Sequence, residues 1–327
     1  MKAGISGRSG DLALSEVVGF VLLLGVIVAA MALWMMYVVP AEGREDEIAQ
    51  MNAVKDRFTD YKITLDSLWI NSNDPSVPTM SGVMVSTSFN LGTPGGSTSA
   101  GGLFLPLMKP VASPATLTLT STNDRMTIKS LGGTVDMNGS YPINKIEYQS
   151  QNYYWIQQKY YYQAGGVFLE QDNGSTTRVA PPISIINSSA GAATPAEFNS
   201  SVTVAPISLE GGASIGGNGP VRVDTRLKSI QRALGPDRKY WVNISVSVPD
   251  YKTARMWNAT FLEALDNEGI PDWWYVTGTS EPGDPAPAVA FVYIKGPFDD
   301  TTHGDVWFTL HPAEYAVTFN NIATGIT

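Results

Sequence analysis

The longest apolar stretch of the chain covers residues 17–39, and these 23 residues include no charged side chain. A helix of this length spans about 35 Å, enough to cross a hydrocarbon core of about 30 Å with some tilt. A buried helix of a soluble protein would carry polar residues on one face, and this stretch has no such face. A secretory signal peptide would have a shorter apolar core and a better cleavage site than residues 35–40 offer. The pattern therefore predicts a membrane helix that is kept in the mature chain.

After the span, apolar residues recur with the period of a helix, at intervals of 3, 4, 3, 4 and 3 residues. This spacing places them on one seam of a helix, with Ile48 one step earlier. We expect the helix to reach about residue 70, where residues 71–75 supply a stop. Packing of this seam against the protein's own head is expected for part of its length and does not exclude packing against other chains. The seam residues are Met51, Val54, Phe58, Tyr61, Leu65 and Leu68. The predicted wet face carries Lys55, Asp56, Arg57, Asp60, Lys62 and Asp66.

Pro40 lies at the junction between the apolar span and the amphipathic helix. Proline lacks a backbone N–H, and its ring presses on the carbonyl four residues earlier, here that of Met36. We expect the helix to kink or to break at Pro40.

The residues that flank the span predict its orientation. Lys2 and Arg8 precede it, whereas the acidic side chains of residues 42–47 follow it with one arginine among them. Because basic residues favour the cytoplasmic side, we expect a single-pass protein of the cell membrane with its N-terminus in the cytoplasm and its head outside. Trp34 and Tyr37 fall near the outer end of the span, where aromatic rings favour the membrane interface.

Beyond residue 75, short runs of β-branched and aromatic residues alternate with Gly, Pro, Asn and Ser. In residues 241–248 apolar and polar side chains alternate, which is typical of a sheet with one wet face. Residues 253–265 are predicted as a helix, and residues 92–102 and 211–220 as loops. The predicted strands are 83–91, 115–122, 125–129, 145–148, 153–162, 167–169, 202–207, 240–248, 289–294, 305–310 and 316–319. The expected fold class is α+β, a long N-terminal hydrophobic and amphipathic helix followed by a mainly antiparallel β-sandwich-like head.

Composition restricts the chemistry that the chain can perform. Its 327 residues include no cysteine and two histidines, so thiolate and multi-histidine metal sites are not expected. The net charge of −9 argues against a nucleic-acid partner, whose phosphates would be repelled. No phosphate-binding loop, nucleophile elbow or catalytic triad spacing is recognisable, and we expect neither a cofactor nor an enzyme.

Three kinds of candidate site remain. Six N-x-Ser/Thr sequons are possible N-glycosylation sites, although a Ser/Thr-rich turn composition also produces them. Asp299, Asp300 and Asp305 offer oxygen ligands for calcium, or form an acidic solvated turn. The aromatic residues within 148–162 and 273–275 offer sugar-stacking faces, or fill the core of the sheet. The sequons begin at Asn138, Asn173, Asn187, Asn199, Asn243 and Asn258.

Residues 11–24 read Asp-Leu-Ala-Leu-Ser-Glu-Val-Val-Gly-Phe-Val-Leu-Leu-Leu. With the short basic leader, the apolar helix and its amphipathic extension, they resemble the N-terminal region of type IV pilins, archaeal ones in particular. Those pilins often show Val-Ser-Pro-Val-Ile-Gly here, where this chain has Leu14-Ser15-Glu16-Val17-Val18-Gly19, so that Glu16 replaces the proline. The resemblance covers residues 1–70 and says little about the head.

The resemblance implies that a membrane prepilin peptidase removes the leader before the helix. The matching string places the cut between Ala13 and Leu14, and the alternative is Gly10 before Asp11, because glycine is usual there in bacterial relatives. The resemblance also implies that Glu16 pairs with the α-amino group of a neighbouring subunit during assembly. The alternative for Glu16 is a hydrated carboxylate at the headgroup boundary.

The expected organisation is a leader over residues 1–13, a transmembrane and amphipathic helix over 14–70, and two β-rich halves of the head over 71–190 and 191–327. The resemblance implies a structural subunit of a type IV pilus-like cell-surface filament, membrane-inserted before assembly and involved in surface attachment. Its partners would be the membrane, copies of itself or related pilins, and the peptidase. The alternative is a permanently membrane-anchored extracellular adhesin or carbohydrate-binding protein.

Overall fold

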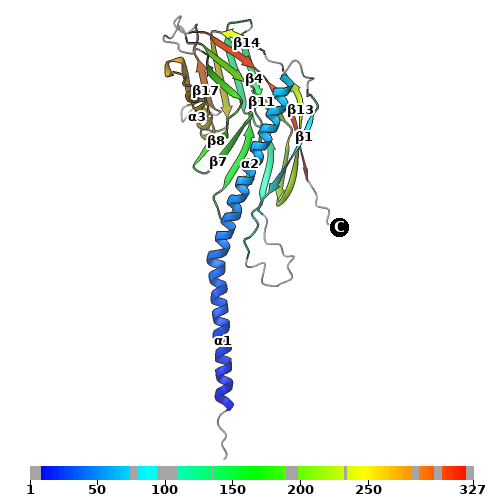
Figure 1. The fold of residues 1–327 in the computed structure, drawn as a ribbon, viewed down its shortest axis with the longest axis vertical. Coiled ribbons are helices and arrows are strands. Elements are labelled where there is room, and N and C mark those ends of the chain that lie inside the picture. Colours follow the sequence, from blue (N-terminus) through cyan, green and yellow to red (C-terminus); the bar gives the residue numbers. More distant parts are fainter. Residues whose placement is uncertain are drawn as a thin grey trace, which may run out of the picture.

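The structure is a computed structural model that describes residues 9–73, 80–93, 109–134, 136–188, 198–231, 234–280, 287–297 and 304–321. A long helical rod projects from a β-rich head (Figure 1). The rod consists of α1 (Ser9–Leu33), the π-helical turn η1 (Trp34–Val38) and α2 (Val39–Asn73). The expected α+β class with a long N-terminal helix is therefore confirmed.

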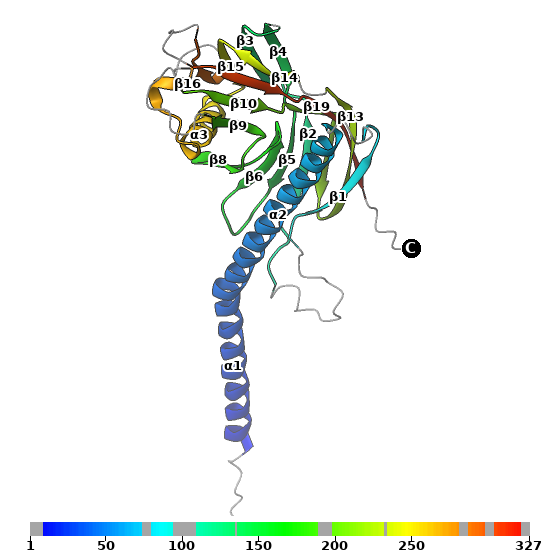
Figure 2. The same ribbon diagram turned by 45° about the horizontal axis from the view of Figure 1, so that its top comes forward.

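The helix continues through Pro40 without a break. Just before it, the N–H of Val39 donates to the carbonyl of Trp34, five residues earlier, as in a π-helix. This wider turn lies where a proline removes one donor and its ring needs room. Figure 2 shows α2 leaning away from the axis of α1, so the rod bends where the sequence allowed either a kink or a break.

The strands of the head form four sheets, which we call A to D. Sheet A has the order β1 (Met84–Leu91), β13 (Gly219–Ile230), β19 (Ala313–Asn321) and β11 (Ile207–Glu210). Sheet B has the order β12 (Ala213–Gly217), β2 (Ala115–Thr120), β5 (Lys145–Ser150), β6 (Gln158–Gln163), β7 (Gly166–Gln171) and β8 (Gly174–Val179). Sheet C has the order β16 (Tyr275–Thr279), β17 (Ala288–Ile294), β15 (Trp241–Val248), β3 (Arg125–Leu131) and β4 (Met137–Pro142). Sheet D has the order β14 (Leu234–Lys239), β18 (Val306–Leu310), β10 (Ser200–Val204) and β9 (Ile183–Asn187).

Most neighbouring strands are antiparallel, as expected, and two pairs, β10 with β18 and β11 with β19, are parallel. The described strands make four sheets instead of the two faces of the expected sandwich. Sheet B separates two hydrophobic cores: Tyr160 and Tyr162 of β6 face one core, and Tyr161 faces the other. The alternation of side chains along β6 makes this possible, because successive residues point to opposite faces.

The expected boundary between residues 190 and 191 does not divide the head. Each sheet combines strands from both sides of it, as when β1 pairs with β13 and β3 with β15. The Ser/Ala/Thr-rich composition near residue 190 lacks long apolar runs, and composition alone cannot separate a connection within one domain from a linker between two. Residues 189–197 themselves lie outside the described residues.

The seam of α2 is buried in the head, which confirms the expected packing. All six seam residues are at most 6% exposed, and they belong to the core between sheets A and B. Two residues expected on the wet face depart from it, because Lys62 is buried and forms a 2.5 Å ion pair with the half-buried Asp66. Asp66 also accepts a hydrogen bond from the indole N–H of Trp69. Lys62 and Asp66 therefore neutralise each other's charge at the contact of α2 with the head. The helical period alone does not reveal this ion pair.

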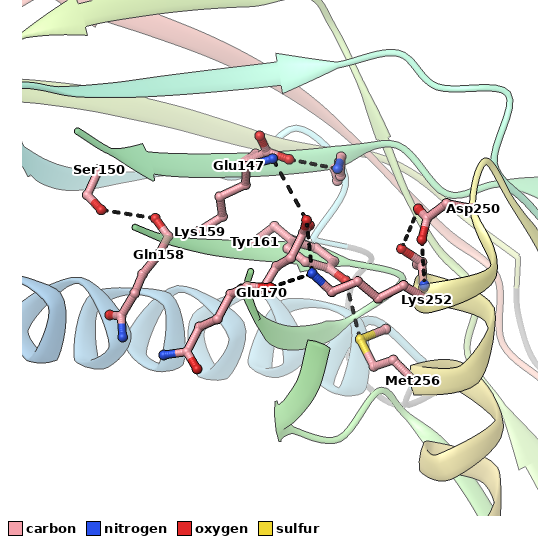
Figure 3. A network of polar contacts seen from close by, with 12 residues as sticks. Glu147, Ser150, Gln158, Lys159, Tyr161, Glu170, Asp250, Lys252 and Met256 are labelled. Atoms are coloured by element: carbon pink, nitrogen blue, oxygen red, sulfur yellow. Dashed lines mark hydrogen bonds and ion pairs between the residues drawn. The ribbon is translucent and has the colours of Figure 1, made fainter. Parts of the chain in front are cut away.

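Helix α3 (Tyr251–Asn267) confirms the predicted helix over 253–265 and is followed by the short η4 (Asp272–Trp274). Asp250 caps it by accepting from the N–H of Thr253 at 2.8 Å. Figure 3 shows how polar contacts tie α3 to sheet B. Lys252 lies 3.7 Å from Glu170 of β7, and the hydroxyl of Tyr161 donates to the sulfur of Met256 at 3.3 Å.

The prediction of loops in residues 211–220 was wrong, since β12 and the start of β13 occupy them. Strands β4, β8, β9, β14 and β16 were also missed. Most of these segments are rich in Gly, Pro, Asn, Ser and Thr, and they become strands because their backbones pair with the edge of another strand, in most cases the one directly before or after it along the chain. Conversely, residues 153–157, predicted as strand, form a loop before β6.

Candidate functional site: the exposed helix and its joint with the head

None of the described residues of the head packs on the apolar part of the rod. From Glu16 to Tyr37 every side chain except that of Met31 is exposed, and Phe20 and Leu22 are each 65% exposed. By its length and composition, this helix is long and apolar enough to cross a membrane. An apolar surface of this size in water is strongly unfavourable, so it needs a cover of lipid or of other apolar helices.

The residues expected at the processing site lie at the start of the rod. Gly10, Asp11, Ala13 and Leu14 belong to α1, and their side chains are outside the described set. The side chain of Glu16 is exposed at the beginning of the apolar surface. Among the residues that the structure describes, none pairs with its carboxylate.

Where the rod enters the head, a glycine lets a ring pack against its backbone. Gly43 is buried, and a Cβ atom there would lie 2.4 Å from the ring of Tyr154. The Tyr154 hydroxyl accepts a hydrogen bond from the N–H of Val111 at 3.1 Å. Glycine at position 43 is therefore needed for this close approach of helix and loop.

One turn later, a buried carboxylate holds the same loop. Glu47 is 1% exposed, and its oxygens accept from the backbone N–H of Tyr153 at 2.6 Å and of Tyr154 at 2.9 Å. The hydroxyl of Ser113 also donates to this carboxylate. A buried carboxylate is costly unless hydrogen-bonded, and three donors compensate Glu47.

Two further contacts flank this turn. The guanidinium of Arg44 lies 4.2 Å from the ring centre of Trp155, within cation–π range. The side-chain amide of Gln50 donates to the carbonyl of Asn90 at 2.7 Å and to the hydroxyl of Tyr148 at 3.1 Å. Burial raises the pKa of Tyr148, which keeps its hydroxyl neutral as a hydrogen-bonding group.

The loop that grips the helix is braced internally. The amide of Asn152 donates to the carbonyl of Ile156 at 2.8 Å, and that of Gln157 donates to the carbonyl of Asn152 at 2.6 Å. We call residues 43–50 of the helix and residues 151–157 of the loop the joint. It fixes the direction in which the rod leaves the head.

The joint was not predicted from the sequence, although two residues at seam positions of the helix indicate it. Gly43 and Glu47 continue the seam backwards from Met51 in steps of four residues, whereas Ile48, expected next to the seam, is only half-buried. A glycine and a carboxylate at seam positions indicate a close approach and a buried polar contact. The partners of Glu47 are 66, 106 and 107 positions away and leave no local pattern.

The aromatic residues expected as sugar-stacking faces are largely core residues. Tyr148, Tyr160, Tyr161 and Tyr162 are at most 5% exposed, which confirms the core interpretation for them. Trp274 is fully buried, whereas Trp273 is 42% exposed.

The acidic cluster is described only in part. Asp299 and Asp300 lie outside the described residues, and Asp305 pairs with Arg238 at 2.6 Å. In the part of the chain that the structure describes, no three His, Asp or Glu side chains are grouped as metal ligands.

The sequon asparagines differ in access. Asn138 on the edge strand β4 and Asn173 in the β7–β8 turn are exposed, whereas Asn187 and Asn243 are half-buried. The side-chain oxygen of Asn199 accepts from the N–H of Asp305 at 2.7 Å. That of Asn258 accepts from the hydroxyl of Thr277 at 2.6 Å.

Comparison of the chain with protein-family models, with curated proteins and with solved structures found no match.

Proposed function

We propose that this protein is a structural subunit of a type IV pilus-like cell-surface filament that is inserted in the membrane before assembly and contributes to surface attachment. One observation carries the proposal: a single helix is buried in the head along its upper part and exposed on all sides along an apolar lower part. In the membrane, lipid covers the apolar part. In a filament, the equivalent helices of neighbouring subunits cover it by packing together.

The joint supports a filament over a simple anchor. Subunits that bundle through their rods must present their heads at one repeated angle, and the contacts of Gly43 and Glu47 set that angle. A permanently anchored head would function equally well on a flexible connection. The orientation of the rod follows the flanking charges, with the N-terminus cytoplasmic and the head outside the cell.

Processing and assembly involve the start of the rod. Removal of residues 1–13 by a prepilin peptidase would make Leu14 the new N-terminus, two residues before Glu16. The exposed Glu16 carboxylate would then pair with the α-amino group of a neighbouring subunit inside the apolar bundle, where an unpaired charge is strongly unfavourable.

The test uses the mass of the mature N-terminus together with electron microscopy of sheared surface material. We expect a chain that begins at Leu14, or at Asp11 for the alternative cut, and filaments that contain this chain. A Glu16→Gln variant should enter the membrane but yield fewer filaments, whereas Glu42→Gln, a change at an exposed carboxylate nearer the head, should assemble normally. Protein that stays in the membrane fraction after shearing, with Met1 intact, would contradict the filament and favour the alternative, a permanently anchored adhesin.

A further inference from the structure

Sheet C has one face that is partly exposed to solvent, which we call the open face. On β15 the residues alternate between buried ones and half-buried ones, and β3 and β17 show the same alternation. The buried face packs on the core that contains α3. On the edge strand β4, exposed residues alternate with half-buried ones that include Met137 and Tyr141, which pack against the same core. Sheet C is therefore built with one face in the core and one face toward solvent.

On the open face, the outward side chains of each strand form a column, and the columns of neighbouring strands differ in chemistry. One row across the five strands contains Val276, Tyr293, Asn243, Lys129 and Asn138. The next row contains Gly278, Phe291, Ser245, Thr127 and Ser140. An aromatic column on β17 thus lies beside amide and hydroxyl groups on β15 and basic groups on β3.

The rings of the aromatic column are held by their neighbours. Tyr293 stacks on Trp241 of β15, with ring centres 5.5 Å apart and planes inclined by 28°. Phe291 reaches across to β16, where a Cβ atom at Gly278 would lie 3.2 Å from its ring. The missing side chain at position 278 leaves room for the ring, an arrangement known to support glycine in sheets. Such rings offer flat apolar surfaces without further loss of side-chain freedom.

The charge of the open face is opposite to that of the whole chain. The chain has a net charge of −9, yet the described outward side chains of these five strands include Arg125 and Lys129 and no carboxylate. The guanidinium of Arg125 is oriented by a hydrogen bond from its Nε to the hydroxyl of Ser140 at 2.8 Å. A basic patch on an acidic protein attracts anionic partners to that face.

We propose that the open face of sheet C binds an acidic polysaccharide, a polymer of uronic acid units. The apolar face of a sugar ring would pack on Tyr293 and Phe291, one of its hydroxyls would donate to the oxygen of Ser245, and its carboxylates would pair with Lys129 and Arg125. The two cations on β3 distinguish such a polymer from a neutral one. The inference does not depend on filament assembly, because an anchored head would present the same face.

Two sequons lie on this face, since Asn138 and Asn243 occupy the same row. A glycan on either residue would cover the proposed binding surface. The test therefore uses the full chain in detergent, purified from a host without N-glycosylation.

The probes are polygalacturonate and, as the neutral control, dextran, with binding measured by isothermal titration calorimetry. We expect binding of polygalacturonate alone, weakened at least about tenfold when sodium chloride is raised from about 50 to about 500 mM. Equal binding of both polymers, or no binding of polygalacturonate at low salt, would overturn the proposal.

Single substitutions test whether the polymer binds at the open face of sheet C. Tyr293→Ala and Lys129→Gln should each weaken binding by about tenfold, because one removes a stacking ring and the other an ion pair. Lys129 is exposed, so its substitution leaves the fold intact even if that of Tyr293 does not. The matched controls are Trp307→Ala, an exposed ring on sheet D, and Arg226→Gln, an exposed cation on sheet A. A loss of affinity in the controls equal to that in the two test variants would place the polymer elsewhere and refute the assignment.

Discussion

The carboxylate of Glu47 accepts a hydrogen bond from the backbone N–H of Tyr154, 107 residues further along the chain, at 2.9 Å. This contact joins the helix that leaves the head to a loop that belongs to the head. The adjacent Tyr153 and Ser113 donate to the same carboxylate. The direction of the rod is therefore fixed by a few polar contacts close to the point where the helix leaves the head.

Replacing Glu47 should loosen the joint. Glu47→Gln substitutes an N–H₂ group for one acceptor oxygen, so at least one buried N–H loses its partner, and we expect a loss of about 1–3 kcal/mol in the free energy of unfolding. Chemical denaturation of the detergent-solubilised chain measures it. Glu45→Gln removes an exposed carboxylate two residues earlier and should leave the unfolding midpoint unchanged. Equal midpoints for the two variants would show that Glu47 does not hold the loop.

Gly43→Ala tests the close approach of the Tyr154 ring. The added methyl group would lie 2.4 Å from the ring, so the loop must shift, and we expect destabilisation of about 1–3 kcal/mol despite the better helix propensity of alanine. Gly25→Ala makes the same change on the exposed rod, where nothing lies within 4 Å. The stability of the head should not change in this control, and a stabilised Gly43→Ala protein would contradict the packing described for the joint.

Residues on the seam of α2 should contribute more to the free energy of unfolding than residues on the exposed face of the same helix. Phe58→Ala removes a fully buried ring from the core between sheets A and B, and we expect a loss of about 3–5 kcal/mol. Ile63→Ala shortens a side chain of the same helix that is 60% exposed, and its effect should stay within about 0.5 kcal/mol. Thermal unfolding followed by circular dichroism compares the two. Comparable losses would mean that the helix is not docked along the stated seam.

Alkaline pH should destabilise the head through buried tyrosines. Burial raises the pKa of Tyr61 above its ordinary value of 10.0, while its hydroxyl is hydrogen-bonded to Thr225 at 2.9 Å. The unfolded chain then releases this proton at lower pH than the folded one, so the stability is complete below pH 10 and declines as pH rises above it. Tyr61→Phe should lower stability at neutral pH by about 1 kcal/mol and make the alkaline decline shallower.

The control for this pH effect is Tyr153→Phe, because Tyr153 is 61% exposed. Its unfolding midpoint should follow pH as that of the unmodified chain does. A Tyr61→Phe protein with an unchanged slope above pH 10 would show that Tyr61 ionises as readily in the folded state as in the unfolded one.

Glycosylation, if the head is outside the cell, should depend on access. We expect glycan on Asn173, whose side chain is exposed in the β7–β8 turn away from sheet C, and none on Asn199 and Asn258, whose side-chain oxygens accept hydrogen bonds. Mass spectrometry of peptides from the native protein measures the occupancy of each sequon. Full occupancy at Asn258 would contradict the described packing of α3 against β16.

The helical segments were predicted well because their signals are local. The apolar span, the seam of α2 and the helix over 253–265 all depend on side chains that lie within a few turns of one another. Pro40 likewise predicted the position of the bend, although the π-helical turn that accommodates the proline was not predicted.

The head was predicted less well because its order is set by distant pairs. β12 and β13 begin in a stretch that resembles a flexible loop, and each becomes a strand through partners about 90 or more residues away. The division at residue 190 failed for the same reason, since every sheet crosses it.

The sequence by itself determined that one uncharged helix needs a cover other than this chain and that an amphipathic continuation docks on a β-rich head. Side-chain chemistry repeated at the period of a helix suffices for both conclusions. Only the tertiary structure decided which loop packs on and hydrogen-bonds to that helix, and which residues share the open face of sheet C. Those relationships include pairs more than 100 positions apart, such as Glu47 with Tyr154 and Lys129 with Asn243. The free energy that selects among such pairings depends on the packing of the whole head.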